Sequence, residues 1–140
     1  MIRVCPHCSA RNRIPAAHLA DAGRCGACKQ ALPPLSEPLD ADAMVFDEIL
    51  QAAKVPVLVD FWAPWCGPCK MAGPEVAKAA ASLAGKALVL KVNTEQQPQL
   101  AAQYKVRSIP HFALFRAGTL VWQQSGLLNH RQLEQIAGGD

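Results

Sequence analysis

No part of this chain of 140 residues approaches the roughly 18 consecutive apolar residues that a membrane-spanning helix needs. Residues 1–5 also lack the apolar run and the cleavage pattern of a secretory signal peptide. We therefore expect a cytoplasmic protein without a membrane partner. In such a reducing compartment, the six cysteines of the chain are better explained as metal ligands or catalytic thiols than as structural disulfides.

Large apolar residues are scarce in residues 1–32, and those present follow no sustained period. A segment this short cannot exclude enough water to fold by itself, so it needs an additional stabilising element. Acidic residues are scarce there too, since residues 1–35 carry five basic side chains and one acidic side chain. The remainder carries nine basic and ten acidic side chains, so the excess positive charge lies in the first segment.

Four cysteines in the first segment can supply the missing stabilisation. Cys5 and Cys8 form one C-x-x-C pair, Cys25 and Cys28 form a second, and 16 residues separate the pairs. This spacing is typical of a zinc ribbon, in which two short turns hold one tetrahedral zinc ion. Because four thiolates leave no open coordination position, the zinc is expected to be structural, or redox-labile if an oxidant reaches the thiolates.

Other interpretations of this segment stay open. The four cysteines could form two local disulfides or remain free, and His7 or His18 could replace one cysteine as a ligand. The basic side chains could contact nucleic acid, but a handful of arginines is more often only a solvated surface, so we expect no nucleic-acid partner.

The chain divides into three predicted parts: a zinc-ribbon module at 1–32, a proline-rich linker at 33–38 and a larger domain at 39–140. In the larger domain, strands alternate with helices first and a hairpin comes last, which predicts an α/β fold with a mixed central sheet between helical layers. The predicted helices lie around 46–53, 66–84, 97–104 and 129–136, and the predicted strands at 55–62, 87–92, 112–115 and 120–124.

A third C-x-x-C pair, Cys66 and Cys69, follows the apolar run 57–62 and opens a helix-like segment. Two thiols three residues apart on a first helical turn can form a disulfide and open it again. The partial positive charge of the helix N-terminus should lower the pKa of Cys66, so Cys66 should attack a substrate disulfide and Cys69 should resolve the product. A third metal-binding turn is the alternative, but no free partner pair is left for it.

Asp60 is a carboxylate within an otherwise apolar strand. Ionising it there is costly, so burial should raise its pKa. A carboxylate of raised pKa behind the cysteine pair could take the proton from Cys69 during attack. The alternative is a surface aspartate at the end of the strand.

The run 61–70, with Asp60 before it and Ile109-Pro110 about forty residues later, resembles the thioredoxin active site almost residue for residue. Together with the four N-terminal cysteines, it is similar to the zinc-containing branch of the thioredoxin family in bacteria. The resemblance implies a thioredoxin fold over 39–140, whose five-stranded mixed sheet is flanked by helices. It also implies a cytosolic reductase of protein disulfides that an NADPH-dependent thioredoxin reductase regenerates. We expect a monomer with no bound organic cofactor.

The same resemblance assigns further roles. Lys91 matches the family lysine that partners the buried carboxylate, and Pro110 matches a cis proline that leaves the backbone of Ile109 free to pair with an extended substrate. His111 stands where many thioredoxins carry threonine. It could lie near the dithiol and bring pH dependence, but we expect it to be an exposed spectator. The remaining substrate-binding rim would consist of Trp65, Gly67, Pro68 and Gly126.

Two other functions compete with a disulfide reductase. An oxidase or isomerase of the same fold is disfavoured because Gly67-Pro68 separates the two cysteines, where oxidising relatives tend to carry a histidine. A binding module, in which the zinc ribbon docks a partner or nucleic acid and the dithiol is incidental, is disfavoured by the intact redox motif.

Overall fold

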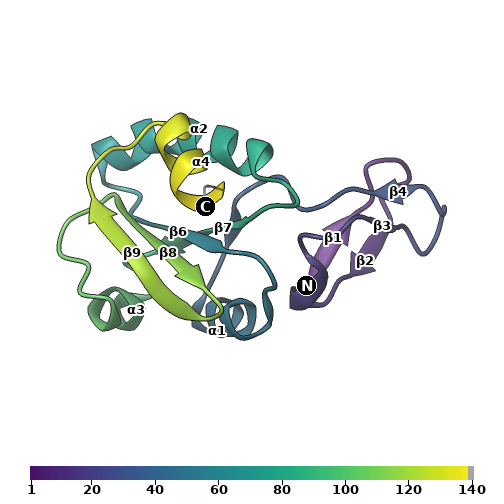
Figure 1. The fold of residues 1–140 in the computed structure, drawn as a ribbon, viewed down its shortest axis with the longest axis horizontal. Coiled ribbons are helices and arrows are strands. Elements are labelled where there is room, and N and C mark those ends of the chain that lie inside the picture. Colours follow the sequence, from purple (N-terminus) through teal and green to yellow (C-terminus); the bar gives the residue numbers. More distant parts are fainter. Residues whose placement is uncertain (139–140) are drawn as a thin grey trace.

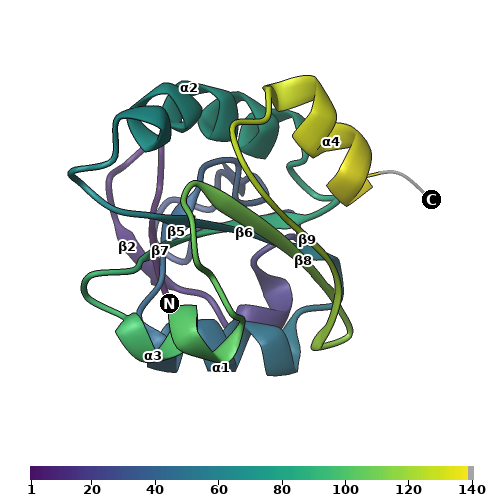
Figure 2. The ribbon, with the colours of Figure 1, turned by 90° about the vertical axis from the view of Figure 1, so that its left-hand side faces the viewer.

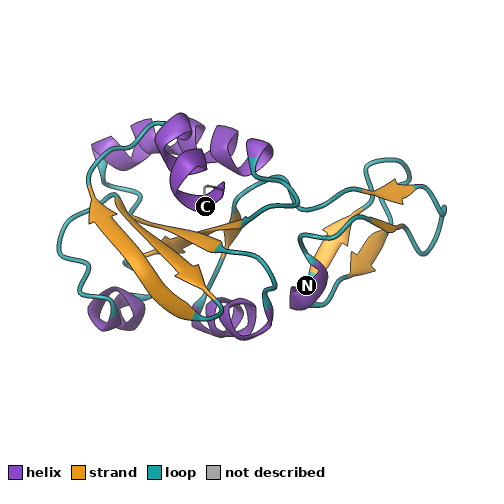
Figure 3. Cartoon of the chain, viewed as in Figure 1, coloured by secondary structure: helices purple, strands orange, loops and turns teal. Residues whose placement is uncertain are grey.

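The computed structural model describes residues 1–138, so residues 139–140 of the predicted larger domain lie outside the described part. A five-stranded sheet with helices on both faces follows two small two-stranded sheets near the N-terminus (Figures 1 and 3). Within the described residues, no helix has the length and apolar character needed to cross a membrane.

The large sheet has the strand order β5-β7-β6-β8-β9. The strands β5, β7 and β6 run parallel, whereas β8 lies antiparallel to β6 and pairs with β9 in a hairpin. This arrangement confirms the predicted mixed sheet and places the short strand β5, which the sequence did not reveal, at one edge. The strands are β5 Leu39–Asp40, β6 Val57–Trp62, β7 Leu88–Asn93, β8 His111–Arg116 and β9 Thr119–Ser125.

Two helices cover each face of this sheet, with α1 and α3 below it and α2 and α4 above it in Figure 2. Local signals fix where they start: Asp42 caps α1 by accepting a hydrogen bond of 2.9 Å from the backbone N–H of Val45, and prolines stand in the first turns of α2 and α3. The helices are α1 Ala43–Ala52, α2 Gly67–Ser82, α3 Pro98–Gln103 and α4 His130–Gly138.

Side chains along β6 alternate between two core layers, and this alternation determines the face of the sheet on which the carboxylate of Asp60 lies. In β6, Val57, Val59 and Phe61 pack in the layer that holds the α1 residues, whereas Leu58 packs in the layer of α2 and α4. Because successive side chains point to opposite faces, Asp60 lies on the same face as Leu58, under α2.

The N-terminal module is built from very short elements, which explains why the sequence shows no period there. Two hairpins, β1–β2 and β3–β4, flank a single turn of 3-10 helix, η1. The elements are β1 Ile2–Val4, β2 Arg11–Arg13, η1 Ala16–His18, β3 Gly23–Arg24 and β4 Ala31–Leu32.

The module shares a hydrophobic core with the larger domain. Leu19 is 1% exposed and belongs to the same buried cluster as Phe46 and Ile49 of α1. Leu35, within the predicted linker, is buried in this cluster as well, and its N–H donates to the carbonyl of Leu19 at 2.9 Å. Burying a leucine side chain contributes about 1.5–3 kcal/mol, so these contacts hold the module against the domain.

The module lies at the end of the sheet opposite to the Cys66–Cys69 pair. Asp21 of the module lies 4.0 Å from the ammonium group of Lys54, which precedes β6, whereas the cysteine pair follows the other end of the same strand. Figure 1 shows β1–β4 beyond one end of the large sheet. Any influence of the module on the dithiol must therefore pass along the sheet.

Candidate redox site and metal site

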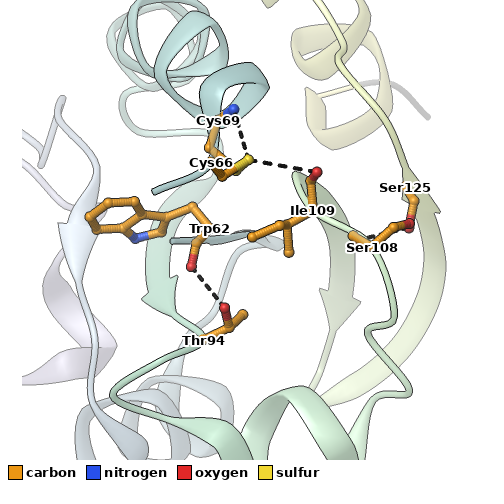
Figure 4. Close-up of a disulfide and its surroundings, with 7 residues drawn as sticks. All are labelled: Trp62, Cys66, Cys69, Thr94, Ser108, Ile109 and Ser125. Atoms are coloured by element: carbon orange, nitrogen blue, oxygen red, sulfur yellow. Dashed lines mark hydrogen bonds between the residues drawn. A yellow bond between two sulfur atoms is a disulfide. The ribbon is translucent and has the colours of Figure 1, made fainter. Parts of the chain in front are cut away.

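The end of β6 positions the redox pair. Thr94 donates two hydrogen bonds to the carbonyl of Trp62, from its N–H at 2.8 Å and from its hydroxyl at 3.1 Å (Figure 4). The chain then turns, and the N–H of Cys66 donates to the carbonyl of Ala63 at 3.1 Å. These bonds fix the point at which β6 ends and the turn into α2 begins.

Cys66 and Cys69 form a disulfide at the start of α2, with their Cα atoms 5.2 Å apart. Cys66 is the N-cap residue of the helix, and its sulfur accepts a hydrogen bond of 3.2 Å from the N–H of Cys69. The helix dipole and this N–H both favour a negative charge on the Cys66 sulfur, as a thiolate nucleophile needs.

Both cysteines are nearly buried in the disulfide form. Cys66 is 4% exposed and Cys69 is 6% exposed, because Ala63, Trp62 and Ile109 pack around both sulfur atoms. The exposed groups beside the disulfide are Trp65, which is 67% exposed, together with Gly67 and Pro68.

The segment around Pro110 faces the disulfide, as the resemblance implies. The Ile109–Pro110 peptide bond is cis, and the Cys66 sulfur lies 3.7 Å from the carbonyl oxygen of Ile109 (Figure 4). Gly126 donates its N–H to the carbonyl of Pro110 at 2.8 Å and has a φ of 113°, a value that favours glycine. The structure thus places Ile109 beside the Cys66 sulfur, with Pro110 and Gly126 joined to each other by a hydrogen bond.

Asp60 is 2% exposed, and its Oδ1 atom has no hydrogen-bond partner within the described residues. Burial raises the pKa of Asp60 from 3.8 to about 7, and the positive charge of Lys91 lowers it only in part. The alternative of a surface aspartate is therefore wrong. A group with this pKa can bind or release a proton near neutral pH.

Lys91 is the direct neighbour of Asp60 in the parallel pairing of β6 with β7. Its ammonium group lies 4.5 Å from the ring centroid of Trp62, a cation–π distance. Lys91 also lines a surface cleft of about 450 Å³ with Asp40 and Asn93. The cleft connects this lysine with solvent, while Asp60 stays buried behind it.

The prediction that His111 is an exposed spectator is wrong. The side chain is only 6% exposed, and its ring meets the ring of Phe61 edge-on with centroids 5.8 Å apart. Both ring nitrogens have partners on β9, Ser125 at 2.8 Å and Gln123 at 2.9 Å. Nothing in the sequence indicated this burial, because the partners come from the next strand of the hairpin.

The four N-terminal cysteines form one cluster. Their sulfur atoms all lie within 4.8 Å of one another, and the shortest distances join the two pairs crosswise: 3.7 Å from Cys5 to Cys28 and 3.6 Å from Cys8 to Cys25. None of the four forms a disulfide. A tetrahedral zinc ion with Zn–S bonds of about 2.3 Å separates its sulfur ligands by about 3.8 Å, so the cluster fits a zinc ion.

Hydrogen bonds around Cys25 favour the charged thiolate that a zinc ligand needs. Backbone N–H donors, led by that of Cys28, and the side chain of Asn12 lower the pKa of Cys25 to about 5. Asn12 also accepts a hydrogen bond of 2.9 Å from the N–H of Gly26, so it braces the second cysteine turn. The sequence did not reveal Asn12, because a single asparagine in an aperiodic segment carries no signal.

A disulfide at a helix N-terminus, with a cis proline beside it and a buried carboxylate in the strand that leads to it, defines a protein-disulfide oxidoreductase of the thioredoxin fold. The thioredoxin family profile matches residues 37–138, and the profile described as "Thioredoxin 2, N-terminal" matches residues 4–30. The chain belongs to the thioredoxin family.

Individual relatives agree with this assignment. The chain is 42% identical over 135 residues to thioredoxin C-3 of Corynebacterium nephridii, a match that covers 96% of this chain and 92% of that protein. It is 40% identical over 99 residues to the thioredoxin of Haemophilus influenzae, covering 71% of this chain and 92% of the relative. The solved structure of a mutant thioredoxin from Halobacterium salinarum superposes with a TM-score of 0.67 at 33% identity, covering 73% of this chain and 88% of that one.

The raised pKa of Asp60 predicts how stability depends on pH. Between its ordinary pKa of 3.8 and the folded value of about 7, the native protein keeps a proton that the unfolded chain releases, so stability falls as the pH rises through this range. Asp60→Asn removes the ionisable group and therefore this loss of stability at high pH. We expect the variant to exceed the parent protein in free energy of unfolding above pH 7, by at most about 4 kcal/mol, and to match it near pH 4.

Urea unfolding of the oxidised protein at both pH values measures this difference. Glu48→Gln, which changes an exposed carboxylate, is the matched control. An Asp60→Asn variant that gains no more stability at high pH than at low pH would show that Asp60 is not buried as a costly charge.

Proposed function

We propose that this protein reduces disulfides in other proteins by thiol–disulfide exchange at Cys66 and Cys69, and that an NADPH-dependent thioredoxin reductase returns it to the dithiol form. The proposal rests on the placement of the two cysteines. Cys66 is the N-cap residue of α2 and accepts a hydrogen bond from the N–H of Cys69, which lies in the first turn of the helix. The family membership supports disulfide substrates and a reductase as partners.

The reaction proceeds in two exchanges. The Cys66 thiolate attacks one sulfur of the substrate disulfide, forming a mixed disulfide and releasing the other substrate sulfur as a thiolate, which takes a proton from water. Cys69 then loses its proton and attacks the Cys66 sulfur. This step forms the Cys66–Cys69 disulfide and releases the second substrate thiolate, so two electrons pass from the protein to the substrate.

Asp60 serves the second exchange. Asp60 lies on the face of β6 that α2 covers, and its pKa of about 7 suits a base for a thiol near neutral pH. Lys91, beside Asp60 and in contact with a solvent-accessible cleft, stabilises the carboxylate and connects it with water. Neither residue needs to touch the substrate.

Substrate binding falls to the rim around the disulfide. Trp65, Gly67 and Pro68 are exposed beside the cysteines, and Ile109 presents its backbone opposite Cys66. An extended polypeptide that contains the target disulfide can pair with this backbone while its side chains lie over the flat rim between Trp65 and Gly126.

One zinc ion bound by Cys5, Cys8, Cys25 and Cys28 completes the proposal. Four thiolates close the coordination sphere, so the ion stabilises the small hairpins and takes no part in the exchange. The protein would work as a monomer without an organic cofactor or a nucleic-acid partner. A cytoplasmic location suits a cluster of free thiols, which persists in a reducing compartment.

The order of the two cysteines is testable by substitution. Cys66→Ser should abolish insulin reduction in the presence of NADPH and thioredoxin reductase, because no nucleophile remains. Cys69→Ser should accumulate a mixed disulfide between Cys66 and the substrate, visible by mass spectrometry after acid quenching. Sustained multiple turnover by the Cys69→Ser protein would refute the two-thiol mechanism.

The metal site predicts one zinc ion per chain after purification under reducing conditions, as measured by elemental analysis. Cys25→Ser should lower the zinc content because three thiolates bind the ion more weakly. Cys69→Ser should keep the full zinc content and is the matched control. Protein that contains no zinc, or zinc loss that follows Cys69 instead of Cys25, would contradict this assignment.

A further inference from the structure

The environment of His111 constrains where its proton lies. Its Nδ1 atom is 2.8 Å from the hydroxyl oxygen of Ser125, and its Nε2 atom is 2.9 Å from the side-chain oxygen of Gln123. The hydroxyl of Ser125 in turn donates a hydrogen bond of 3.2 Å to the carbonyl of Ser108 (Figure 4). These groups form one chain of hydrogen bonds between β8, β9 and the segment before Pro110.

A serine hydroxyl has a single hydrogen to donate. Both contacts of Ser125 can be hydrogen bonds only if its hydroxyl donates to Ser108 and its oxygen accepts from His111, an arrangement that places a proton on Nδ1. The Nε2 atom can then either donate to the oxygen of Gln123 or, after a half-turn of this exposed amide, accept from its nitrogen. In this arrangement Nδ1–H is the donor to Ser125.

The chain of hydrogen bonds ends on the peptide group that includes the N–H of Ile109. The carbonyl of Ser108 and the N–H of Ile109 belong to one planar unit, so a bond that holds the carbonyl also fixes the direction of the N–H. The carbonyl of Ile109 lies 3.7 Å from the Cys66 sulfur. The backbone of Ile109 thus joins this chain of hydrogen bonds to the surroundings of the Cys66 sulfur.

We propose that His111 is a positioning residue for substrates that bind as an extended polypeptide. Through the hydroxyl of Ser125 it holds the Ser108–Ile109 peptide in the orientation that pairs with substrate backbone, and the edge-on contact with Phe61 holds the imidazole in place. Disulfides without a flanking polypeptide gain less from this orientation. The inference rests on the proposed function, because it concerns how that site receives its substrate.

The tautomer of His111 tests the hydrogen-bond chain without any activity measurement. At a pH well above the ordinary histidine pKa of about 6.5, nitrogen chemical shifts of labelled protein distinguish a neutral ring protonated at Nδ1 from one protonated at Nε2. We expect the Nδ1–H form in the parent protein, and its loss in Ser125→Ala, where no acceptor remains. A neutral His111 protonated at Nε2 in the parent protein would overturn the proposal.

Kinetics with two substrates tests the consequence. His111→Asn can still offer an N–H near the position of Nδ1, whereas His111→Phe keeps the ring and loses the donor. We expect KM for a peptide with an internal disulfide to rise about fivefold in His111→Phe, the value of one hydrogen bond, and to recover in His111→Asn. KM for a small aromatic disulfide should rise much less.

Ser125→Ala should raise KM for the peptide to a similar extent, and the double variant with His111→Phe should be no worse than Ser125→Ala alone, because both act through one hydroxyl. Gln124→Ala, on the opposite face of β9, is the matched control. Equal losses for both substrates, or equal losses in His111→Phe and His111→Asn, would reject the positioning role. A parent protein that reduces neither substrate would reject the proposed function and leave the tautomer result standing.

Discussion

The chemistry proposed for the redox centre depends on one buried carboxyl group, that of Asp60. Asp60 lies in the middle of the sheet, paired on one side with Lys91 and on the other with Phe112, and its face of β6 is covered by α2. The surrounding apolar layer raises the pKa of Asp60 to about 7, which destabilises the native state near neutral pH. A buried carboxyl group of this kind is costly for stability, and its position in the core fits the role proposed for Asp60 as the base for Cys69.

Other parts of the fold hold the redox centre in place, and the zinc ribbon lies farthest from it. Thr94 fixes the end of β6, the N-cap geometry of Cys66 directs N–H groups at its sulfur, and Ile109 closes the other side. The zinc ribbon lies at the far end of the sheet, where Leu19 joins the core. Because of this separation, the metal cluster can support the fold but does not touch the redox pair.

Periodicity and local motifs predicted the larger domain well, because its strands and helices are long enough to show their buried faces. The two C-x-x-C pairs near the N-terminus likewise predicted a cluster that the sulfur distances support. What the sequence could not show depends on contacts between distant segments. Leu19 and Leu35 lie in stretches with no period, and β5 has only two residues. His111 looks like a surface residue until Ser125 and Gln123 are brought beside it by the β8–β9 hairpin.

The most direct test of the central claim separates the two exchanges in time. Rapid mixing of reduced protein with a peptide disulfide resolves formation of the mixed disulfide from its resolution by Cys69. If Asp60 accepts the proton of Cys69, Asp60→Asn will slow resolution far more than the initial attack by Cys66, and the mixed disulfide will accumulate transiently. Equal slowing of both steps, or of neither, would contradict the assignment of the buried carboxylate as the base.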